Sequence, residues 1–157
     1  MRLRHILVPV VVLTAGVVTL EGAASAAPTK VGIETFTLTA DINAEGGPVT
    51  ASGVINDTGV DIVVSDTQDT FGFGANGQIT VFHSPIRHRD HFSEKKCSFS
   101  VTEKGTYVFG NGTGDWANYN GSGTYTLEAH ATNACDDPPV GTFTIRAKGP
   151  INLSTDG

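Results

Sequence analysis

The stretch of the chain richest in reactive side chains is residues 82–92, FHSPIRHRDHF. It holds three histidines, two arginines and one aspartate within eleven residues. Imidazole and carboxylate groups bind zinc and copper, and His88 and His91 offer two imidazoles from one short segment. A metal site is therefore one interpretation of this stretch.

Two other interpretations of the same stretch remain open. Arginines and histidines gathered at one place also suit an anionic ligand, and on that basis His83, Arg87 and His88 are candidate ligand-binding residues. Arg87 and Arg89 would repel a cation unless they point away, so we expect no resident metal. The simplest interpretation is a solvated, charged loop between a strand that ends near His83 and one that begins near Lys95.

The other combinations of catalytic residue types are weaker. Hydrolysis by paired carboxylates needs two acids that converge in a cleft. The acids before residue 70 are scattered around one predicted hairpin, where turn formation and solubility explain them; they are Asp57, Asp61, Asp66 and Asp69. No Gly-x-Ser-x-Gly nucleophile motif is present, which argues against a serine hydrolase.

The elements that must position these residues are strands. Apolar and polar residues alternate with a period of two, which is typical of half-buried antiparallel strands, in segments 36–42, 60–64, 79–83, 97–101, 125–131 and 143–147. Turn-forming residues interrupt the alternation at 45–48, 56–59, 74–77 and 136–139. No stretch has sustained helical periodicity.

Short strands at this spacing predict an all-β domain, either a single antiparallel β-barrel of about eight strands or a β-sandwich. We expect one domain within residues 27–157. The residues predicted to line or fill its interior are Phe36, Leu38, Ile62, Val64, Val81, Phe99, Val101, Leu127, Phe143 and Ile145.

A glycine-rich segment, GNGTGDWANYNGSGTYT at residues 110–126, raises the question of a phosphate-binding loop. Such a loop needs a nearby basic residue and a following helix. Neither Lys nor Arg occurs between Lys104 and Arg146, and a strand pattern follows Gly123. The glycines therefore favour strand corners with close backbone approach.

The same segment resembles the glycine-rich hairpin of the allene oxide cyclase-like barrel superfamily, which includes dirigent proteins and short secreted bacterial proteins. The matching pattern is Gly112-Thr113-Gly114, an aromatic at Trp116, and Gly121-x-Gly123-x-Tyr125. The resemblance implies an eight-stranded antiparallel barrel in which this segment joins two neighbouring strands. It transfers no catalytic residue, because the functional residues of those proteins cannot be placed on this chain by motif.

The first 26 residues are typical of an export signal. Arg2 and Arg4 precede an apolar run at 6–20, and Ala24-Ser25-Ala26 predicts cleavage after Ala26. The run is short for a membrane span, so we expect no membrane anchor and a secreted, extracellular protein.

Charge and cysteine content narrow the remaining possibilities. Removing two arginines and Glu21 with the signal leaves 10 − 2 = 8 basic and 16 − 1 = 15 acidic residues, a net charge of −7. An acidic domain is a poor candidate for nucleic acid. Cys97 and Cys135 are most simply a disulfide in an exported protein. No cofactor is expected, and the sequence does not indicate an oligomeric state.

The leading functional interpretation is a secreted barrel that binds a small hydrophobic molecule or has a purely structural or interaction role. One alternative is a cyclase or isomerase acting on an apolar substrate in the barrel. His83 is then the candidate catalytic group, because it shares a face with Ile79 and Val81. Another alternative is an extracellular interaction module with Trp116 and Tyr119 exposed, although a plug in the barrel is the favoured role for this pair.

Overall fold

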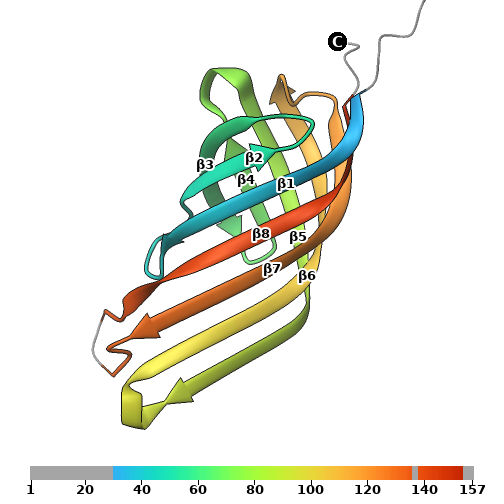
Figure 1. Ribbon diagram of the computed structural model, residues 1–157. Coiled ribbons are helices and arrows are strands. Elements are labelled where there is room, and N and C mark those ends of the chain that lie inside the picture. Colours follow the sequence, from blue (N-terminus) through green and yellow to red (C-terminus); the bar gives the residue numbers. More distant parts are fainter. Residues whose placement is uncertain (1–29, 136–137, 154–157) are drawn as a thin grey trace, which may run out of the picture.

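Eight antiparallel strands close into a barrel in the computed structural model, which describes residues 30–135 and 138–153 (Figure 1). They are β1 (Lys30–Asp41), β2 (Pro48–Ser52), β3 (Asp57–Ser65), β4 (Gln68–Gly72), β5 (Gly77–Ser93), β6 (Ser98–Gly114), β7 (Tyr119–Thr132) and β8 (Val140–Leu153). Each strand pairs with its sequence neighbours, and β8 pairs with β1. The predicted barrel is confirmed and the alternative sandwich is wrong. The predicted export signal and its cleavage site lie outside the described residues.

The strands differ greatly in length, and this shapes the molecule. β2 and β4 have 5 residues each, whereas β5 and β6 have 17 each. Figure 1 shows β5 to β8 running on past the short strands as a curved sheet, which we call the extension. Along the extension β5 pairs with β6 alone, because its pairing with β4 ends at Phe82.

The charged stretch at residues 82–92 belongs to β5, so its interpretation as a loop is wrong. Pro85 is tolerated because β5 is an edge strand at this point, where a proline need not interrupt a ladder on both sides. The register with β6 shifts between Pro85 and Arg87, which marks a β-bulge. The strand then continues to Ser93.

The end of the barrel at which β1 begins and β8 ends is filled with aromatic side chains. Trp116 is fully buried and stacks on Phe73 with ring centroids 4.3 Å apart. Tyr119 is also buried, with its ring centroid 4.9 Å from that of Trp116. Trp116 lies in the turn between β6 and β7, so the glycine-rich segment is a hairpin and the predicted plug is confirmed.

β3 has its apolar side chains on the outside of the barrel, contrary to the prediction for Ile62 and Val64. These two side chains are 53% and 54% exposed, whereas Asp61 is 4% exposed. The pairing with β2 explains the inversion, because buried Val49 lies opposite Gly59 and so fixes the faces of β3. A Cβ at Gly59 would overlap the Gly72 carbonyl, so the inward position there has no room for a side chain.

The remaining predicted interior residues divide between the barrel and the extension. Phe36, Leu38 and Val81 are buried, and Leu127 and Ile145 face the barrel interior. Those on the same face farther along the extension are only half-buried; they are Phe99, Val101 and Phe143. The inner surface of the barrel therefore continues onto an open sheet.

A disulfide fastens the far end of the extension. Cys97 and Cys135 are bonded, as predicted, with Cα atoms 5.0 Å apart. Cys97 follows the short 3-10 turn Glu94–Lys96 that joins β5 to β6, and Cys135 follows β7. The bond therefore ties the β5–β6 turn to the end of the neighbouring strand. In the described part of the chain, no helix has the length and apolar character needed to cross a membrane.

Candidate functional site

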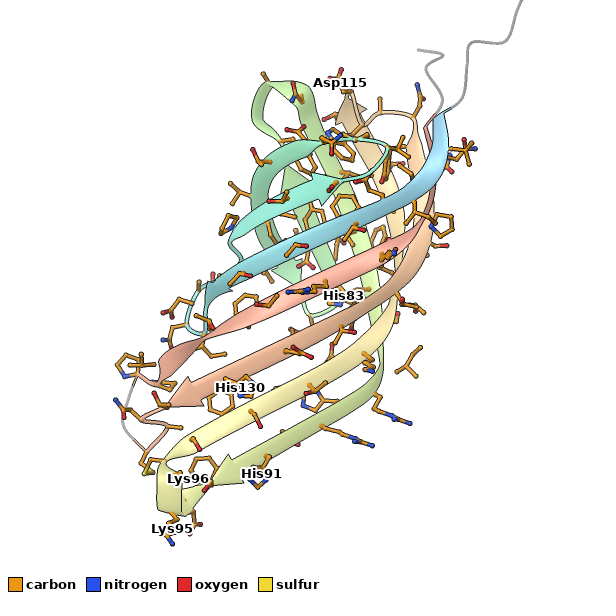
Figure 2. The ribbon with its side chains drawn as sticks, in the orientation of Figure 1. His83, His91, Lys95, Lys96, Asp115 and His130 are labelled. Carbon is orange, nitrogen blue, oxygen red and sulfur yellow. A yellow bond between two sulfur atoms is a disulfide. The ribbon has the colours of Figure 1, made fainter. Side chains whose placement is uncertain are left out.

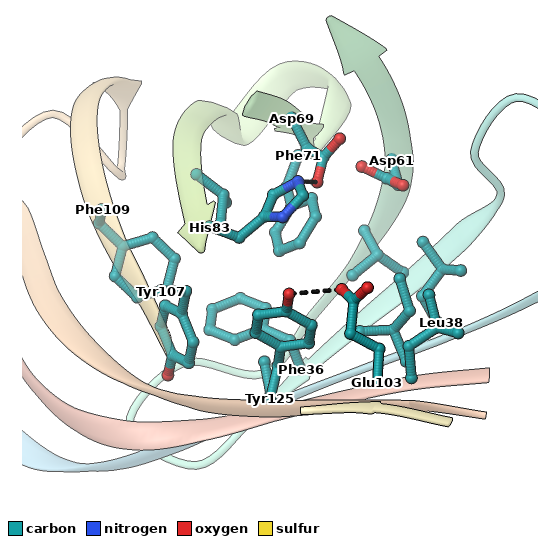
Figure 3. A pocket seen from close by; sticks show the side chains of 15 residues that line it. Phe36, Leu38, Asp61, Asp69, Phe71, His83, Glu103, Tyr107, Phe109 and Tyr125 are labelled. Carbon is teal, nitrogen blue, oxygen red and sulfur yellow. Dashed lines mark hydrogen bonds and ion pairs between the residues drawn. The ribbon is translucent and has the colours of Figure 1, made fainter. Parts of the chain in front are cut away.

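A cavity of about 70 Å³ lies inside the barrel, next to the aromatic plug. Most of its lining is apolar and comes from all strands except β3, including Phe36, Leu38, Val49, Phe71, Val81, Phe109, Leu127, Ile145 and Ala147. The volume accommodates several water molecules or part of a small organic ligand. Four polar groups also line the cavity, one each from β3, β4, β5 and β6, together with two tyrosines, Tyr107 on β6 and Tyr125 on β7 (Figure 3).

Asp61 is the most buried of the acids that line the cavity. It points inward because its strand places Gly59 and Asp61 on the inner face. Its Oδ1 atom is buried and has no hydrogen-bond partner among the described residues. Burial, together with the charge of Asp69, raises the pKa of this carboxyl from 3.8 to about 7. Near neutral pH Asp61 therefore exists in both its protonated and ionised forms.

Asp69 and His83 form a pair on adjacent strands. The Nε2 atom of His83 lies 3.2 Å from Oδ2 of Asp69, with side-chain exposures of 23% and 16%. Burial raises the pKa of Asp69, while His83 opposes that shift. The carboxylate orients the imidazole, and the ring of His83 meets that of Tyr125 edge-on at 5.8 Å. The pair thus presents a positioned imidazole to the cavity.

Glu103 holds a second set of hydrogen bonds at the cavity mouth. The Tyr125 hydroxyl donates to Oε1 of Glu103 at 2.6 Å, and Nδ1 of His88 lies 3.0 Å from Oε2. Burial and the bond to Glu103 raise the pKa of Tyr125. Gly105, opposite Tyr125, makes this geometry possible, because a Cβ there would overlap the tyrosine ring.

The strand geometry separates the residues singled out in the sequence. His83 lines the cavity, and His88 lies at its mouth with 53% side-chain exposure. Arg87 is exposed and pairs in register with Lys104, on the face opposite to Glu103. His91 also faces away from His88, because residues three apart on a strand point to opposite sides. The ligand-binding role of these residues stays a prediction.

The proposed chelation by His88 and His91 is not compatible with this arrangement. Within residues 30–135 and 138–153, no group of three His, Cys, Asp or Glu side chains is placed to hold a metal ion. His91 lies farther along the extension than His83 (Figure 2).

A second polar cluster is buried beside the plug. Glu34 is fully buried, and its Oε2 accepts a hydrogen bond from the Ile55 amide at 2.9 Å. Burial raises the pKa of Glu34 and also that of Tyr107, the latter to about 12, with Glu34 adding to the tyrosine's shift. Burial also raises the pKa of Tyr119, and Glu34 and Tyr107 add to that shift. Tyr107 also lines the cavity, so this cluster adjoins it.

Sequence reasoning missed most of the polar groups in the cavity. The sequence pattern attributes Asp61 and Asp69 to turn formation and solubility, whereas both side chains line the cavity. Glu103 had a usable signal, since it continues the alternating series of Phe99 and Val101 on one face of its strand. The sequence signal for Asp61 was weaker: it is the only acidic residue in the otherwise apolar segment VDIVV.

Comparison with known protein families, with characterised proteins and with solved structures found no match to this chain. The function of the protein is therefore inferred from the cavity and the polar groups that face it.

Proposed function

We propose that the protein binds a small, mainly apolar molecule inside the barrel, with the molecule's polar group against Asp61. The observation that carries the proposal is the buried Oδ1 of Asp61, which has no partner among the described residues and lies in a cavity with a mostly apolar lining. A buried polar atom without a hydrogen bond destabilises the folded protein, and a ligand that donates a hydrogen bond to this atom removes that penalty on binding. Solvent reaches His83, Asp69 and Glu103, which marks the side from which a ligand enters.

A cavity-filling substitution tests the proposal. Val81→Phe places a ring in the cavity, whereas Val108→Phe adds the same ring on the outer surface, where Val108 is 49% exposed. Binding of benzyl alcohol is followed by the amide chemical shifts of cavity residues. We expect saturable shifts for the wild type and Val108→Phe, and their loss in Val81→Phe. If neither benzyl alcohol nor cyclohexanol at millimolar concentration changes the amide chemical shifts of the wild type, the proposal is overturned.

The second candidate function is proton transfer by an isomerase or cyclase on an apolar substrate. The specific observation in its favour is the Asp69–His83 pair, in which a carboxylate orients an imidazole toward an apolar cavity. His83→Ala would then abolish turnover of a bound substrate while leaving its affinity and the thermal stability close to those of the wild type. Equal loss of stability and binding would assign His83 a structural role.

Localisation and family belong to this proposal too. We propose that the chain is exported through its first 26 residues, that residues 27–157 form the mature domain, and that it acts extracellularly. The disulfide supports an oxidising compartment. The closed barrel and the β6–β7 hairpin agree with the resemblance to the allene oxide cyclase-like superfamily. An interaction module remains an alternative, but its predicted surface is absent because Trp116 and Tyr119 are buried.

A further inference from the structure

Acidic side chains outnumber basic ones around the cavity. Three carboxyl groups line it, those of Asp61, Asp69 and Glu103. Two imidazoles accompany them, His83 in the lining and His88 at the mouth. Among the described residues that line the cavity there is no lysine or arginine. A bound group near these acids therefore meets negative potential whenever they are ionised.

The three acids differ in how much of their hydrogen-bonding capacity is already used. Asp69 is paired with His83, and Glu103 accepts from Tyr125 and contacts His88. Asp61 alone keeps a buried oxygen without a partner among the described residues. It is therefore the acid that is free to hold a ligand.

The basic side chains on β5, β6 and β8 beside the cavity-lining residues point away from the cavity and cannot bind an anionic ligand inside it. Arg87 and Lys104 are exposed and line a depression on the outside of the barrel, and Arg146 and Lys148 are exposed on β8, whose inner face carries Ala147. An anion in the cavity would therefore face carboxyl groups with no fixed cation to offset them, and its burial would be strongly unfavourable.

Resting on the proposed binding function, we infer that the ligand is a small apolar amine whose ammonium group pairs with the Asp61 carboxylate inside the barrel. The aromatic and aliphatic lining receives the hydrocarbon part. The ammonium donates to the open Oδ1 of Asp61, so the ionised carboxylate, which is costly when it is buried alone, gains a partner of opposite charge. The aromatic ring of Phe71, on the strand next to Asp61, adds a further surface suited to a cation.

Binding of such a cation is linked to protonation of Asp61. The ionisable groups that line the cavity with it are Asp69 on β4, His83 on β5, Glu103 and Tyr107 on β6 and Tyr125 on β7. A carboxyl with a pKa of about 7 is about one-tenth ionised at pH 6 and about three-quarters ionised at pH 7.5. The ammonium competes with the proton, so its affinity should rise roughly eightfold between these two pH values.

Three matched probes separate this inference from the binding function on which it rests: benzylamine, benzyl alcohol and benzoate. Calorimetric titration of the full, disulfide-bonded protein is carried out at pH 6 and pH 7.5, in two buffers of different ionisation enthalpy. We expect benzylamine to bind at least tenfold more tightly than benzyl alcohol at pH 7.5, benzoate not to bind, and close to one proton to be released per benzylamine at pH 6. Asp61→Asn should remove the preference for the amine and the proton release, whereas Asp66→Asn, an exposed acid at the β3–β4 turn, should keep both.

The outcomes are distinguishable. If benzyl alcohol binds as tightly as benzylamine, or if benzoate binds best, the amine inference is overturned and the apolar binding function stands. Retention of the amine preference by a folded Asp61→Asn variant, confirmed by its circular dichroism, also overturns it. If none of the three probes binds the wild type, both the inference and the binding function fail for ligands of this size.

Discussion

Replacing Asp61 with asparagine should change how the stability of this protein depends on pH. The folded state holds the Asp61 proton more tightly than the unfolded chain, because its pKa is raised from 3.8 to about 7. The stability associated with this group is therefore fully present below about pH 4 and is lost as the pH rises through 7. Asparagine has no proton to lose, so the variant lacks this component.

The size of the effect can be worked out from the pKa shift. A difference of about 3 pKa units, at about 1.36 kcal/mol per unit, corresponds to about 4 kcal/mol. Since Asp61 is 4% exposed, solvent screening reduces this value little. Between pH 4 and pH 8.5, the difference in unfolding free energy between Asp61→Asn and the wild type should move by about 4 kcal/mol in favour of the variant.

Urea unfolding of both proteins at the two pH values, with the disulfide intact, measures this double difference. Other titrating groups are common to the two proteins and largely cancel. Asp66→Asn serves as the matched control, since Asp66 is exposed at the β3–β4 turn and its replacement should leave the difference within about 0.5 kcal/mol of zero. If this double difference for Asp61→Asn is as small as that of the control, the conclusion that burial raises the pKa of Asp61 is refuted.

Three further variants test other parts of the structure. Trp116→Ala empties the plug and should lower the unfolding free energy by roughly 4 kcal/mol in a urea titration, because the ring is fully buried; a loss below 1 kcal/mol would contradict the plug. Replacing Cys97 and Cys135 together by alanine should lower the unfolding free energy by roughly 4 kcal/mol, because the disulfide closes a loop of 38 residues. Hydrogen exchange should lose protection first at the far end of the extension, and a uniform loss across the barrel would contradict a local role for the disulfide. Gly105→Ala should displace the Tyr125 ring and break its hydrogen bond to Glu103, so the pKa of Tyr125 should fall toward its ordinary value. A pH titration of the tyrosine absorbance measures this change, and an unchanged titration would show that the position of the ring does not depend on Gly105.

The all-β architecture could be predicted because period-two alternation is a local property of each strand. The alternation at residues 36–42 and 125–131 assigns both strand and inner face correctly. The same rule gave the wrong face for β3, since its apolar residues lie outside and Asp61 inside. The face there is set by pairing with β2 and by the lack of room at Gly59, both of which depend on contacts between strands.

The candidate site was predicted only in part, for a related reason. His83 shares its face with Ile79 and Val81, so the sequence placed it inside the barrel. Its partner Asp69 lies on the preceding strand, and the register Asp69 opposite Val81 that brings the two together cannot be read from local spacing. The error over residues 84–93 arose because Pro85 and the charges are typical of a loop, yet they are also tolerated on an edge strand.

The edge of β5 has a consequence for how copies of this protein behave when crowded together. Residues 84–93 pair with β6 on one side, and no described strand covers the other, so their backbone groups there are open to pairing with a strand of a second molecule. Pro85, the bulge beside it and the charged Arg87 and Arg89 interrupt such pairing. Side chains that suggested ligand chemistry in the sequence thus act against aggregation of the barrels into continuous sheets.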